Sequence, residues 1–326
     1  DEVLRYCVMD TILPIEILEA IHAIRSKESL ASVARMPFQR AVGGTTSQWI
    51  DSLMVRLADR EKVAIPRTRS GPRRDQIVGG HVQDVDSGLH PWIAVLDFKS
   101  MYPSIMISNN ICSTTLVRDD STDDSHSVSP TTETRYLSKD ERIGLVPHLL
   151  EQLMSSRDQH KAALAAARES GDEAEAFLQD QLQYAVKILM NSFYGVFASS
   201  FYRFTHPDLG ASITEWARHN IRKIISDLEI EGYDVVYSDT DSIFVRTPVG
   251  ADAPINKPEE SSPEFESWGR ARAETIRFGE RLAERFTKEG AELEFETALS
   301  AFFSHGAKKR YVGRVIWPLS LIHISE

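Results

Sequence analysis

Two aspartates, Asp239 and Asp241, stand two residues apart in the polar segment 237–242. Largely apolar residues lead into this segment at 233–236 and out of it at 243–245, which predicts two strands joined at the tip of a β-hairpin. Carboxylates held this close repel one another and favour a hard cation such as Mg²⁺. Asp and Ser are also common turn formers, so the segment taken alone is also consistent with an ordinary surface turn that binds no metal.

A third carboxylate, Asp97, ends the apolar run 92–96. A continuous run of this length predicts a strand buried on both faces. An acid at its end is costly unless it finds partners, and one such role is to cap the short helix expected after Pro103. If Asp97 instead meets the hairpin pair, the cluster could hold two Mg²⁺ ions and support in-line phosphoryl transfer.

Basic, amide and aromatic side chains share faces of two predicted helices. Lys187, Asn191 and Tyr194 follow one another at i, i+4 and i+7, and Arg157 and Lys161 at i and i+4. Cations suit phosphates and a ring suits stacking, so the two faces could together clamp a nucleotide. The alternative is a solvated helical surface.

Apolar periodicity and turn residues predict the elements that must position these side chains. We expect helices over 3–30, 47–60, 146–168, 173–198, 208–229 and 264–289, strands within 291–316, and loops at 62–90, 118–134 and 248–263. The helices on either side of Gly171 should form an antiparallel hairpin. The polar stretch 118–134 is interpreted as a mobile loop.

Composition narrows the class of protein. The chain has 326 residues, 42% of them hydrophobic and 26% charged, as in ordinary globular proteins. Only Cys7 and Cys112 are present, which argues against a disulfide scaffold or a cysteine-ligated zinc site. No apolar run reaches membrane-spanning length, and no signal peptide is evident. The net charge of −11 opposes binding of nucleic acid by bulk charge, although local basic clusters occur at 67–74, 218–223 and 308–310.

Four segments in order resemble the motifs of family B DNA polymerases. Residues 97–105 resemble motif A, 187–195 motif B, 237–242 motif C, and 308–311 the later basic motif. Ser238 stands where the family usually has Gly, so its Cβ could perturb contacts with the primer end. The similarity runs from about residue 1 to about residue 316 and is closer to archaeal and eukaryotic replicative enzymes than to protein-primed viral ones.

The resemblance implies a role for each matched residue. Asp97 and Asp241 would bind both metal ions together with the Phe98 carbonyl, and Asp239 would complete the catalytic set. Nucleotide binding would fall to Ser100, Met101, Tyr102, Arg157, Lys161, Lys187, Asn191 and Tyr194. Tyr102 would pack against the sugar and exclude a 2′-hydroxyl. DNA binding would fall to Thr240, Lys308, Lys309, Arg310 and Tyr311.

The implied fold is α+β, a palm with a mixed, mainly antiparallel sheet and an inserted helical fingers hairpin. The palm would comprise 63–145 and 199–317, and the fingers 146–198. Residues 1–62 would be the end of an exonuclease domain with connecting helices. Tyr6 and Asp10 match the last motif of that domain, but the other carboxylates of an exonuclease site are not in this chain. The tail 318–326 matches nothing in the family, and the thumb is expected to be absent.

The expected function is DNA-templated DNA synthesis with two Mg²⁺ ions, primer–template DNA and dNTPs. We expect weak activity or none from the fragment itself, and an intracellular location, in the cytoplasm and nucleoid or in a nucleus. A sliding clamp could bind through a missing C-terminus, and no membrane is involved. Two alternatives remain. A non-catalytic family B module that binds DNA as a scaffold should have lost the metal-binding aspartates. A metal-dependent phosphohydrolase would not need Tyr102 or the face formed by Lys187, Asn191 and Tyr194.

Overall fold

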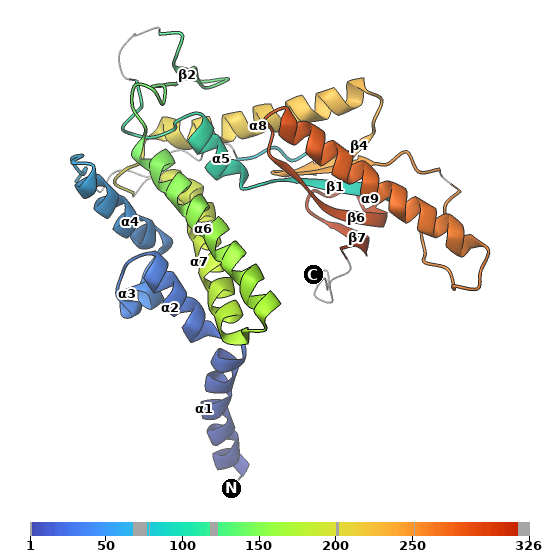
Figure 1. The fold of residues 1–326 in the computed structure, drawn as a ribbon, viewed down its shortest axis with the longest axis horizontal. Coiled ribbons are helices and arrows are strands. Elements are labelled where there is room, and N and C mark those ends of the chain that lie inside the picture. Colours follow the sequence, from blue (N-terminus) through green and yellow to red (C-terminus); the bar gives the residue numbers. More distant parts are fainter. Residues whose placement is uncertain are drawn as a thin grey trace. The chain divides into compact units, whose positions relative to one another are not determined.

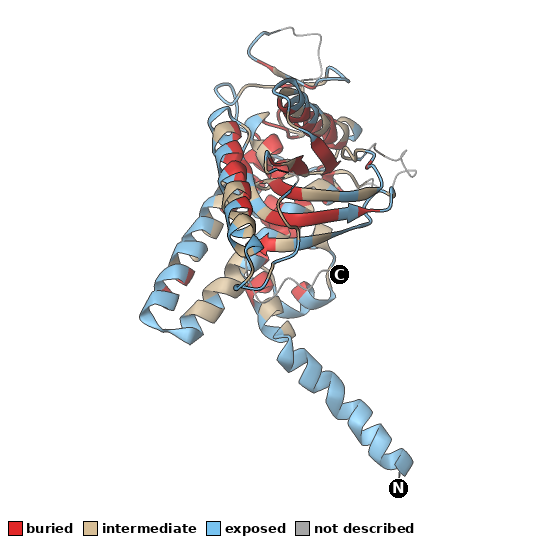
Figure 2. Cartoon of the chain, turned by 90° about the vertical axis from the view of Figure 1, so that its right-hand side faces the viewer, coloured by how far each residue is buried: buried red, intermediate tan, exposed pale blue. Residues whose placement is uncertain are grey.

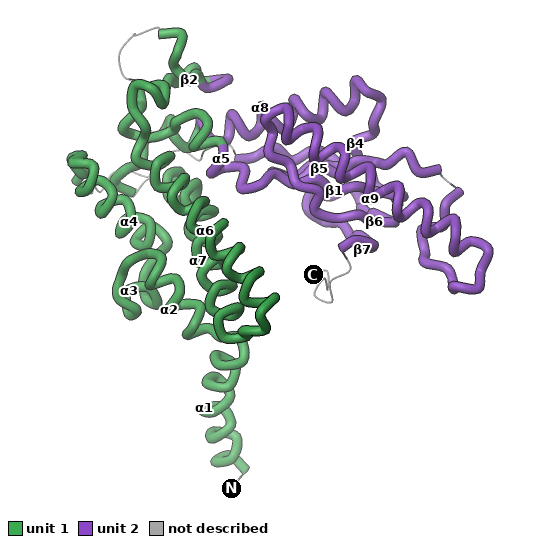
Figure 3. The backbone as a smooth tube through the Cα atoms, in the orientation of Figure 1, with its two compact units in different colours: residues 1–77, 105–128, 132–211 green, residues 78–104, 129–131, 212–326 purple. Residues whose placement is uncertain are grey.

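A computed structural model describes residues 2–67, 77, 79–117, 123–199, 202–250 and 252–318. The chain divides into two compact units (Figure 3). Unit 1 comprises residues 1–77, 105–128 and 132–211, and unit 2 comprises 78–104, 129–131 and 212–326. Within the described residues, no helix has both the length and the apolar character needed to cross a membrane.

Unit 2 is built on a five-stranded sheet with the strand order β4-β5-β1-β6-β7 (Figure 1). Its strands are β1 (Gly88–Phe98), β4 (Val235–Asp239), β5 (Ser242–Arg246), β6 (Leu293–Ser304) and β7 (Tyr311–Trp317). Neighbouring strands in this sheet pair antiparallel. The antiparallel sheet and the accompanying helices confirm the predicted α+β class.

Strand β1 lies at the centre of the sheet and is buried on both faces, as its continuous apolar run predicts. Ile93 and Val95 join one core cluster with the aromatic side chains of Tyr237 and Phe302. Trp92 belongs to a second cluster that includes residues of helix α9 (Glu264–Lys288). Helix α9 therefore covers one face of the sheet, and the central strand is fixed from both sides.

Two further helices flank the sheet. Helix α5 (Met101–Ser108) follows β1, and helix α8 (Pro207–Ile230) precedes β4. Helix α8 has the predicted position, whereas α5 begins at Met101 and so contains Pro103 instead of following it. Gly232, with a φ of 84°, provides the left-handed residue needed between α8 and β4. This order places the chain reversal at β4–β5 beside the end of β1.

Unit 1 is mainly helical. Its helices include α2 (Ala23–Val33), α3 (Phe38–Gly43), α4 (Thr46–Arg60), α6 (Leu145–Ser170) and α7 (Glu173–Phe197). Helices α6 and α7 form the predicted antiparallel hairpin: Gly171 ends α6 with a φ of 75°, and the Asp172 side chain accepts a hydrogen bond from the Glu175 backbone N–H at 3.0 Å. Helix α3 was not predicted.

The predicted helix over 3–30 is broken in two. Helix α1 (Glu2–Ala20) ends before His22, which has a φ of 51°, and α2 begins at Ala23. No residue of α1 is buried, and Figure 2 shows this helix exposed along its length. Its apolar residues, such as Ile15 and Leu18, are therefore exposed in this structure, although their spacing suggested a core face.

The polar stretch 118–134 is not a loop throughout. Strand β2 (Ser127–Val128) pairs antiparallel with β3 (Arg135–Tyr136) within unit 1. Residues 118–122 lie outside the described residues. Buried Tyr136 anchors this small ribbon, which the sequence pattern did not reveal because each strand has only two residues.

Candidate active site

Asp97 lies at the end of the central strand, directly opposite the hairpin. In the sheet register it faces Ser242 of β5 on one side and Glu294 of β6 on the other. The Ser242 hydroxyl donates a hydrogen bond to Asp97 Oδ1 at 2.8 Å. The Phe98 backbone N–H donates to the Asp241 carbonyl at 3.0 Å. These bonds attach the end of β1 to the hairpin tip, 145 residues further along the chain.

The hairpin tip is a two-residue turn. Asp239 pairs with Ser242, which leaves Thr240 and Asp241 as the turn residues. Thr240 takes a left-handed conformation with a φ of 58°, and the Asp241 N–H donates to the Asp239 carbonyl at 2.6 Å. A short turn of this kind needs a residue with positive φ, which a Thr adopts only at a cost of order 1–3 kcal/mol. The surrounding contacts hold Thr240 in place.

Asp97 and Asp241 come close enough to influence one another. The pKa of Asp97 is raised to about 7, chiefly by burial; the negative charges of Asp241, Glu296 and Glu294 contribute to the rise, and the Ser242 hydrogen bond opposes it. Burial also raises the pKa of Asp241, with a further contribution from the charge of Asp239. Carboxylates whose charged forms are disfavoured in this way gain from a bound cation.

Asp239 has a different partner. Its Oδ1 accepts hydrogen bonds from Lys309 Nζ at 2.6 Å and from Thr240 Oγ1 at 3.0 Å. The oxygens of Asp97, Asp239 and Asp241 do not all lie within 4.8 Å of one another. The three aspartates nevertheless lie at the same end of neighbouring strands, and Lys309 supplies a positive charge beside Asp239.

Within the described residues, a different group meets that spacing. One ligand atom each from Asp123, His126 and Glu141, all in unit 1, lie within 4.8 Å of one another. His126 is buried and its Nε2 lies 3.5 Å from Glu141 Oε2. This group was not predicted, because Asp123 and His126 fall in the stretch 118–134 that was interpreted as a mobile loop and Glu141 lies beyond it.

Residues 80–83 run beside the outer edge of β4. The Thr240 N–H donates to the His81 carbonyl at 2.7 Å, and the Gln83 N–H donates to the Ser238 carbonyl at 2.9 Å. A Cβ added at Gly80 would lie 3.2 Å from the Tyr102 hydroxyl oxygen and 3.0 Å from Thr240 Cγ2. Tyr102 and the hairpin tip therefore both lie close to the backbone at Gly80, where a side chain would fit only tightly.

The residues between Asp97 and Tyr102 form a tight bend. Ser100 has a φ of 51°, and its carbonyl accepts a hydrogen bond from the Ser104 N–H at 3.0 Å as α5 begins. Met101 is buried, and the Lys99 N–H donates to the Glu292 carbonyl at 2.9 Å. The bend connects the carboxylate at the strand end to the first turn of α5.

The basic segment after β6 packs against the hairpin. Lys309 has a φ of 63°, and its N–H donates to the Tyr237 hydroxyl at 3.0 Å. The ring of Tyr311 contacts those of Tyr237, Phe244 and Phe302, with centroids 5.2–5.6 Å apart. Lys308 reaches Asp84 Oδ1 at 3.1 Å. Arg310 is exposed, and its N–H donates to the Ala307 carbonyl.

Two of the basic clusters noted in the sequence converge on His81. Positive charges on Arg222, Lys308 and Arg218 all act on its imidazole, and they add to burial in lowering its pKa. Arg218 also donates to the Gly79 carbonyl at 2.7 Å. The sequence gives no signal for this convergence, because α8 and the β6–β7 connection are far apart in the chain.

The five predicted nucleotide-binding residues of the helical hairpin lie in unit 1. Arg157 and Lys161 are on α6, and Lys187, Asn191 and Tyr194 are on α7. Lys161, Lys187 and Asn191 are exposed, whereas Arg157 and Tyr194 are partly buried. The Arg157 Nε is buried without a hydrogen-bond partner. Both sets lie on helices, as predicted, so residues four apart share one face of their helix.

Comparison with known proteins identifies the family. The sequence profile of DNA polymerase family B matches residues 36–256, more than half of the chain. The chain therefore belongs to DNA polymerase family B.

Similar proteins come from plants and archaea. The chain is 30% identical over 325 residues to the DNA polymerase delta catalytic subunit of Glycine max, covering 94% of this chain and 28% of that protein. It is 30% identical to DNA polymerase 1 of Pyrococcus abyssi, covering 76% of this chain and 32% of that protein. The chain thus spans about a third of the length of these relatives.

The fold is similar to that of a solved structure. The family B DNA polymerase of Pyrobaculum calidifontis matches 97% of this chain and 38% of its own, with a TM-score of 0.67 and 22% sequence identity.

Proposed function

We propose that this chain carries the palm and fingers of a DNA-templated DNA polymerase, which joins a dNTP to a primer 3′-hydroxyl and releases pyrophosphate. Membership of DNA polymerase family B supports this activity. The observation that carries the proposal is the attachment of Asp97 to the hairpin tip, through Ser242 and through the Phe98 N–H, which brings Asp97 and Asp241 within electrostatic reach.

The proposed cofactor is a pair of Mg²⁺ ions held by Asp97, Asp241 and the Phe98 carbonyl, with Asp239 beside them. The donor set fits, because hard carboxylate oxygens suit Mg²⁺, and a bound cation would offset the burial and the neighbouring negative charge that raise the pKa of both aspartates. When bound, such ions activate the attacking oxygen and stabilise the leaving one. Lys309 would neutralise Asp239 until primer and nucleotide arrive.

The residues after Asp97 are proposed to position the nucleotide. The backbone near Ser100 and Met101 would cradle the triphosphate, and Tyr102 would lie under the sugar. The Tyr102 hydroxyl and Thr240 Cγ2 both lie within 3.2 Å of the position that a Cβ at Gly80 would take, and this closeness of the ring to the hairpin tip supports the assignment. Binding of this kind accelerates the reaction by holding the reacting atoms in the correct geometry.

The hairpin of α6 and α7 is proposed to be the fingers, residues 146–198. Arg157, Lys161, Lys187 and Asn191 would hold the triphosphate, and Tyr194 would lie near the new base pair. The palm would then comprise 63–145 and 199–317, with residues 1–62 belonging to the end of an exonuclease domain. The exposed cations on the facing helices support the assignment.

DNA contacts are proposed for Thr240, Lys308, Lys309, Arg310 and Tyr311. The gathering of Arg218, Arg222 and Lys308 around His81 adds positive charge next to the hairpin, where a phosphate backbone would pass. This local positive charge would allow DNA to bind here although the chain as a whole carries a net charge of −11. The substrates would be primer–template DNA and dNTPs, inside the cell.

Primer extension under single-turnover conditions tests the proposal, because we expect the isolated chain to be weakly active. With excess protein, labelled primer–template, dNTPs and Mg²⁺, Asp241→Ala should slow incorporation by at least about 1,000-fold, equivalent to about 4 kcal/mol of transition-state stabilisation. DNA binding should change little. Asp227→Ala, an acid of α8 outside the proposed site, is the control.

Undiminished incorporation by Asp241→Ala would refute the metal role. If the wild-type chain binds DNA but neither it nor a longer protein that carries it incorporates nucleotide, the alternative of a non-catalytic DNA-binding scaffold is correct.

A further inference from the structure

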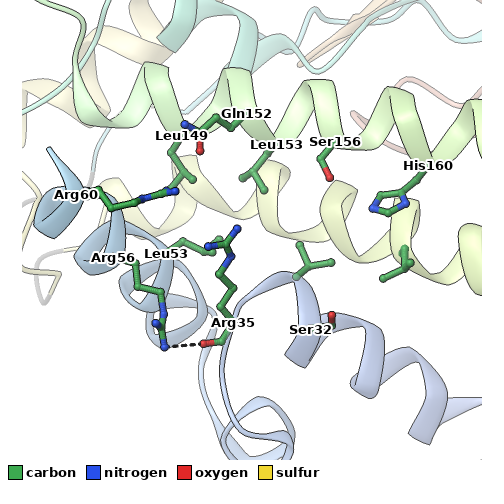
Figure 4. Close-up of a pocket in the computed structure, with 12 residues that line it drawn as sticks. Ser32, Arg35, Leu53, Arg56, Arg60, Leu149, Gln152, Leu153, Ser156 and His160 are labelled. Carbon is green, nitrogen blue, oxygen red and sulfur yellow. Dashed lines mark hydrogen bonds between the residues drawn. The ribbon is translucent and has the colours of Figure 1, made fainter.

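A cavity of about 300 Å³ lies within unit 1, between α2 and α4 on one side and the α6–α7 hairpin on the other. Its floor is apolar and includes Leu53, Leu149 and Leu153, all of them buried. Its rim carries three arginines, Arg35, Arg56 and Arg60, all exposed. Figure 4 shows Arg60 and Arg35 reaching over this floor towards α6. The cavity thus combines an apolar floor with a positively charged rim.

The position of Arg35 is built into the backbone. Arg35 takes a φ of 52°, a left-handed conformation that usually needs glycine. Its carbonyl accepts hydrogen bonds from two side chains of α4, Arg56 Nη2 at 3.2 Å and Ser52 Oγ at 3.3 Å. These bonds hold the end of α2 against α4 and fix the Arg56 guanidinium against the backbone of Arg35.

The three guanidinium groups have no carboxylate within ion-pair distance among the residues that the structure describes. By contrast, Arg203 of the same unit pairs with Asp51 at 3.0 Å. Unneutralised guanidinium groups at one rim suit a phosphate, to which they donate two parallel hydrogen bonds.

The opposite wall offers an amide, a hydroxyl and an imidazole. Gln152, Ser156 and His160 follow one another at four-residue spacing on α6 and line the cavity. The His160 Nδ1 is 2.6 Å from Gln179 Oε1, which fixes the imidazole ring. Ser156 and Gln152 can donate to or accept from the edge of a base or a sugar hydroxyl.

We propose that this cavity binds a phosphate-bearing nucleotide unit, with its phosphate on Arg35 and Arg60 and its base over Leu53 and Leu149. Its volume lies at the lower end of the range for ligand sites, which suits a single nucleotide. The unit could be a free nucleotide or one nucleotide of a single strand. The site is separate from the aspartates of unit 2, and the inference does not rest on the proposed polymerase function.

Calorimetric titration with dAMP in EDTA tests the proposal. Chelation of divalent metal ions removes metal-dependent nucleotide binding at the aspartates. The wild-type chain should bind one dAMP, Arg60→Gln should weaken binding about tenfold, and Arg35→Gln with Arg60→Gln about 100-fold, as expected for loss of charged hydrogen bonds. Arg168→Gln, an exposed arginine of α6 outside the cavity, should bind as the wild type does. Circular dichroism should show that the variants are folded.

A second arm with the oligonucleotide dT5 distinguishes the two sources. Binding of dT5 through the same arginines and more tightly than dAMP would identify a single strand, whereas preference for dAMP would identify a free nucleotide. The proposal is overturned if dAMP and dT5 fail to bind, or bind the double variant as tightly as the wild type. It is also overturned if Asp97→Asn with Asp241→Asn abolishes dAMP binding, since the ligand would then lie in unit 2.

Discussion

The ammonium group of Lys309 lies 2.6 Å from Asp239 Oδ1, a contact across 70 residues of sequence. Lys309 is largely exposed, whereas Asp239 is mostly buried. The lysine therefore neutralises a carboxylate beside the proposed metal ligands, and it competes with any cation that approaches the same oxygen.

Lys309→Met should change Mg²⁺ binding and catalysis in opposite directions. Without the ammonium group, the aspartates should bind Mg²⁺ about two- to fivefold more tightly, the range expected for loss of an exposed ion pair. Incorporation should fall, because the proposed contact with the primer is lost. Mg²⁺-dependent melting and primer extension measure the two effects. Weaker Mg²⁺ binding in Lys309→Met would show that the lysine organises the site instead of competing for it.

Gly80→Ala should disturb Tyr102 and the hairpin tip together. The added methyl group would lie 3.2 Å from the Tyr102 hydroxyl oxygen and 3.0 Å from Thr240 Cγ2, so both must move by a few tenths of an ångström. We expect incorporation of dNTPs to fall about tenfold and selection against ribonucleotides to change. Single-nucleotide incorporation of dATP and ATP measures both, with Gly79→Ala, where a Cβ meets open space, as the control. Equal behaviour of the two variants would contradict the positioning role.

The metal-free protein should lose stability as pH rises through the range in which Asp97 ionises. The folded-state pKa of Asp97 is raised from 3.8 to about 7, so its contribution is present below about pH 4 and is lost as pH approaches 7. In EDTA, melting from pH 5 to 8 should therefore show a fall in Tm that Asp97→Asn reduces. With partial solvent screening, the effect should be of order 1 kcal/mol, or about 2–4 °C.

Saturating Mg²⁺ should remove most of this pH dependence in the wild type, because bound cations favour the ionised carboxylates. If the wild type and Asp97→Asn lose stability in parallel between pH 5 and 8, the titrating group is another residue.

Ser238→Ala should be neutral or stabilising, although Ser238 is fully buried. Its hydroxyl has no hydrogen-bond partner, whereas its backbone carbonyl accepts a bond from Gln83. Removing an unsatisfied buried hydroxyl avoids its desolvation cost of about 1–3 kcal/mol. Thermal melting should show an unchanged or higher Tm. A loss of more than about 1 kcal/mol would mean that the hydroxyl is satisfied, for example by an ordered water.

The sequence predicted local structure where a strong local signal exists. Gly171 and Asp172 mark the turn of the helical hairpin, and the polar turn at Asp239–Asp241 marks the β-hairpin. The break at His22 was missed because apolar residues continue across it, so periodicity alone favours one helix.

The contacts within the candidate site were less predictable. Asp97 at a strand end and the acids of the hairpin tip could be recognised separately, but their attachment through Ser242 depends on the pairing of β1 with β5. The approach of Glu294 to Asp97 likewise depends on the pairing with β6. Pairings between distant strands leave no mark in local sequence, so these neighbours appear only in the folded chain.

The Gln83 N–H donates to the Ser238 carbonyl, and the Thr240 N–H just beyond the strand donates to the His81 carbonyl, so residues 81–83 cover the outer edge of β4 next to the hairpin tip. A strand from a neighbouring domain or from another molecule could therefore not pair with β4 at this position. Among the described strands, β7 at the opposite border is the place where such an addition could occur. Growth of the sheet would therefore proceed away from the aspartates and leave them accessible to substrate.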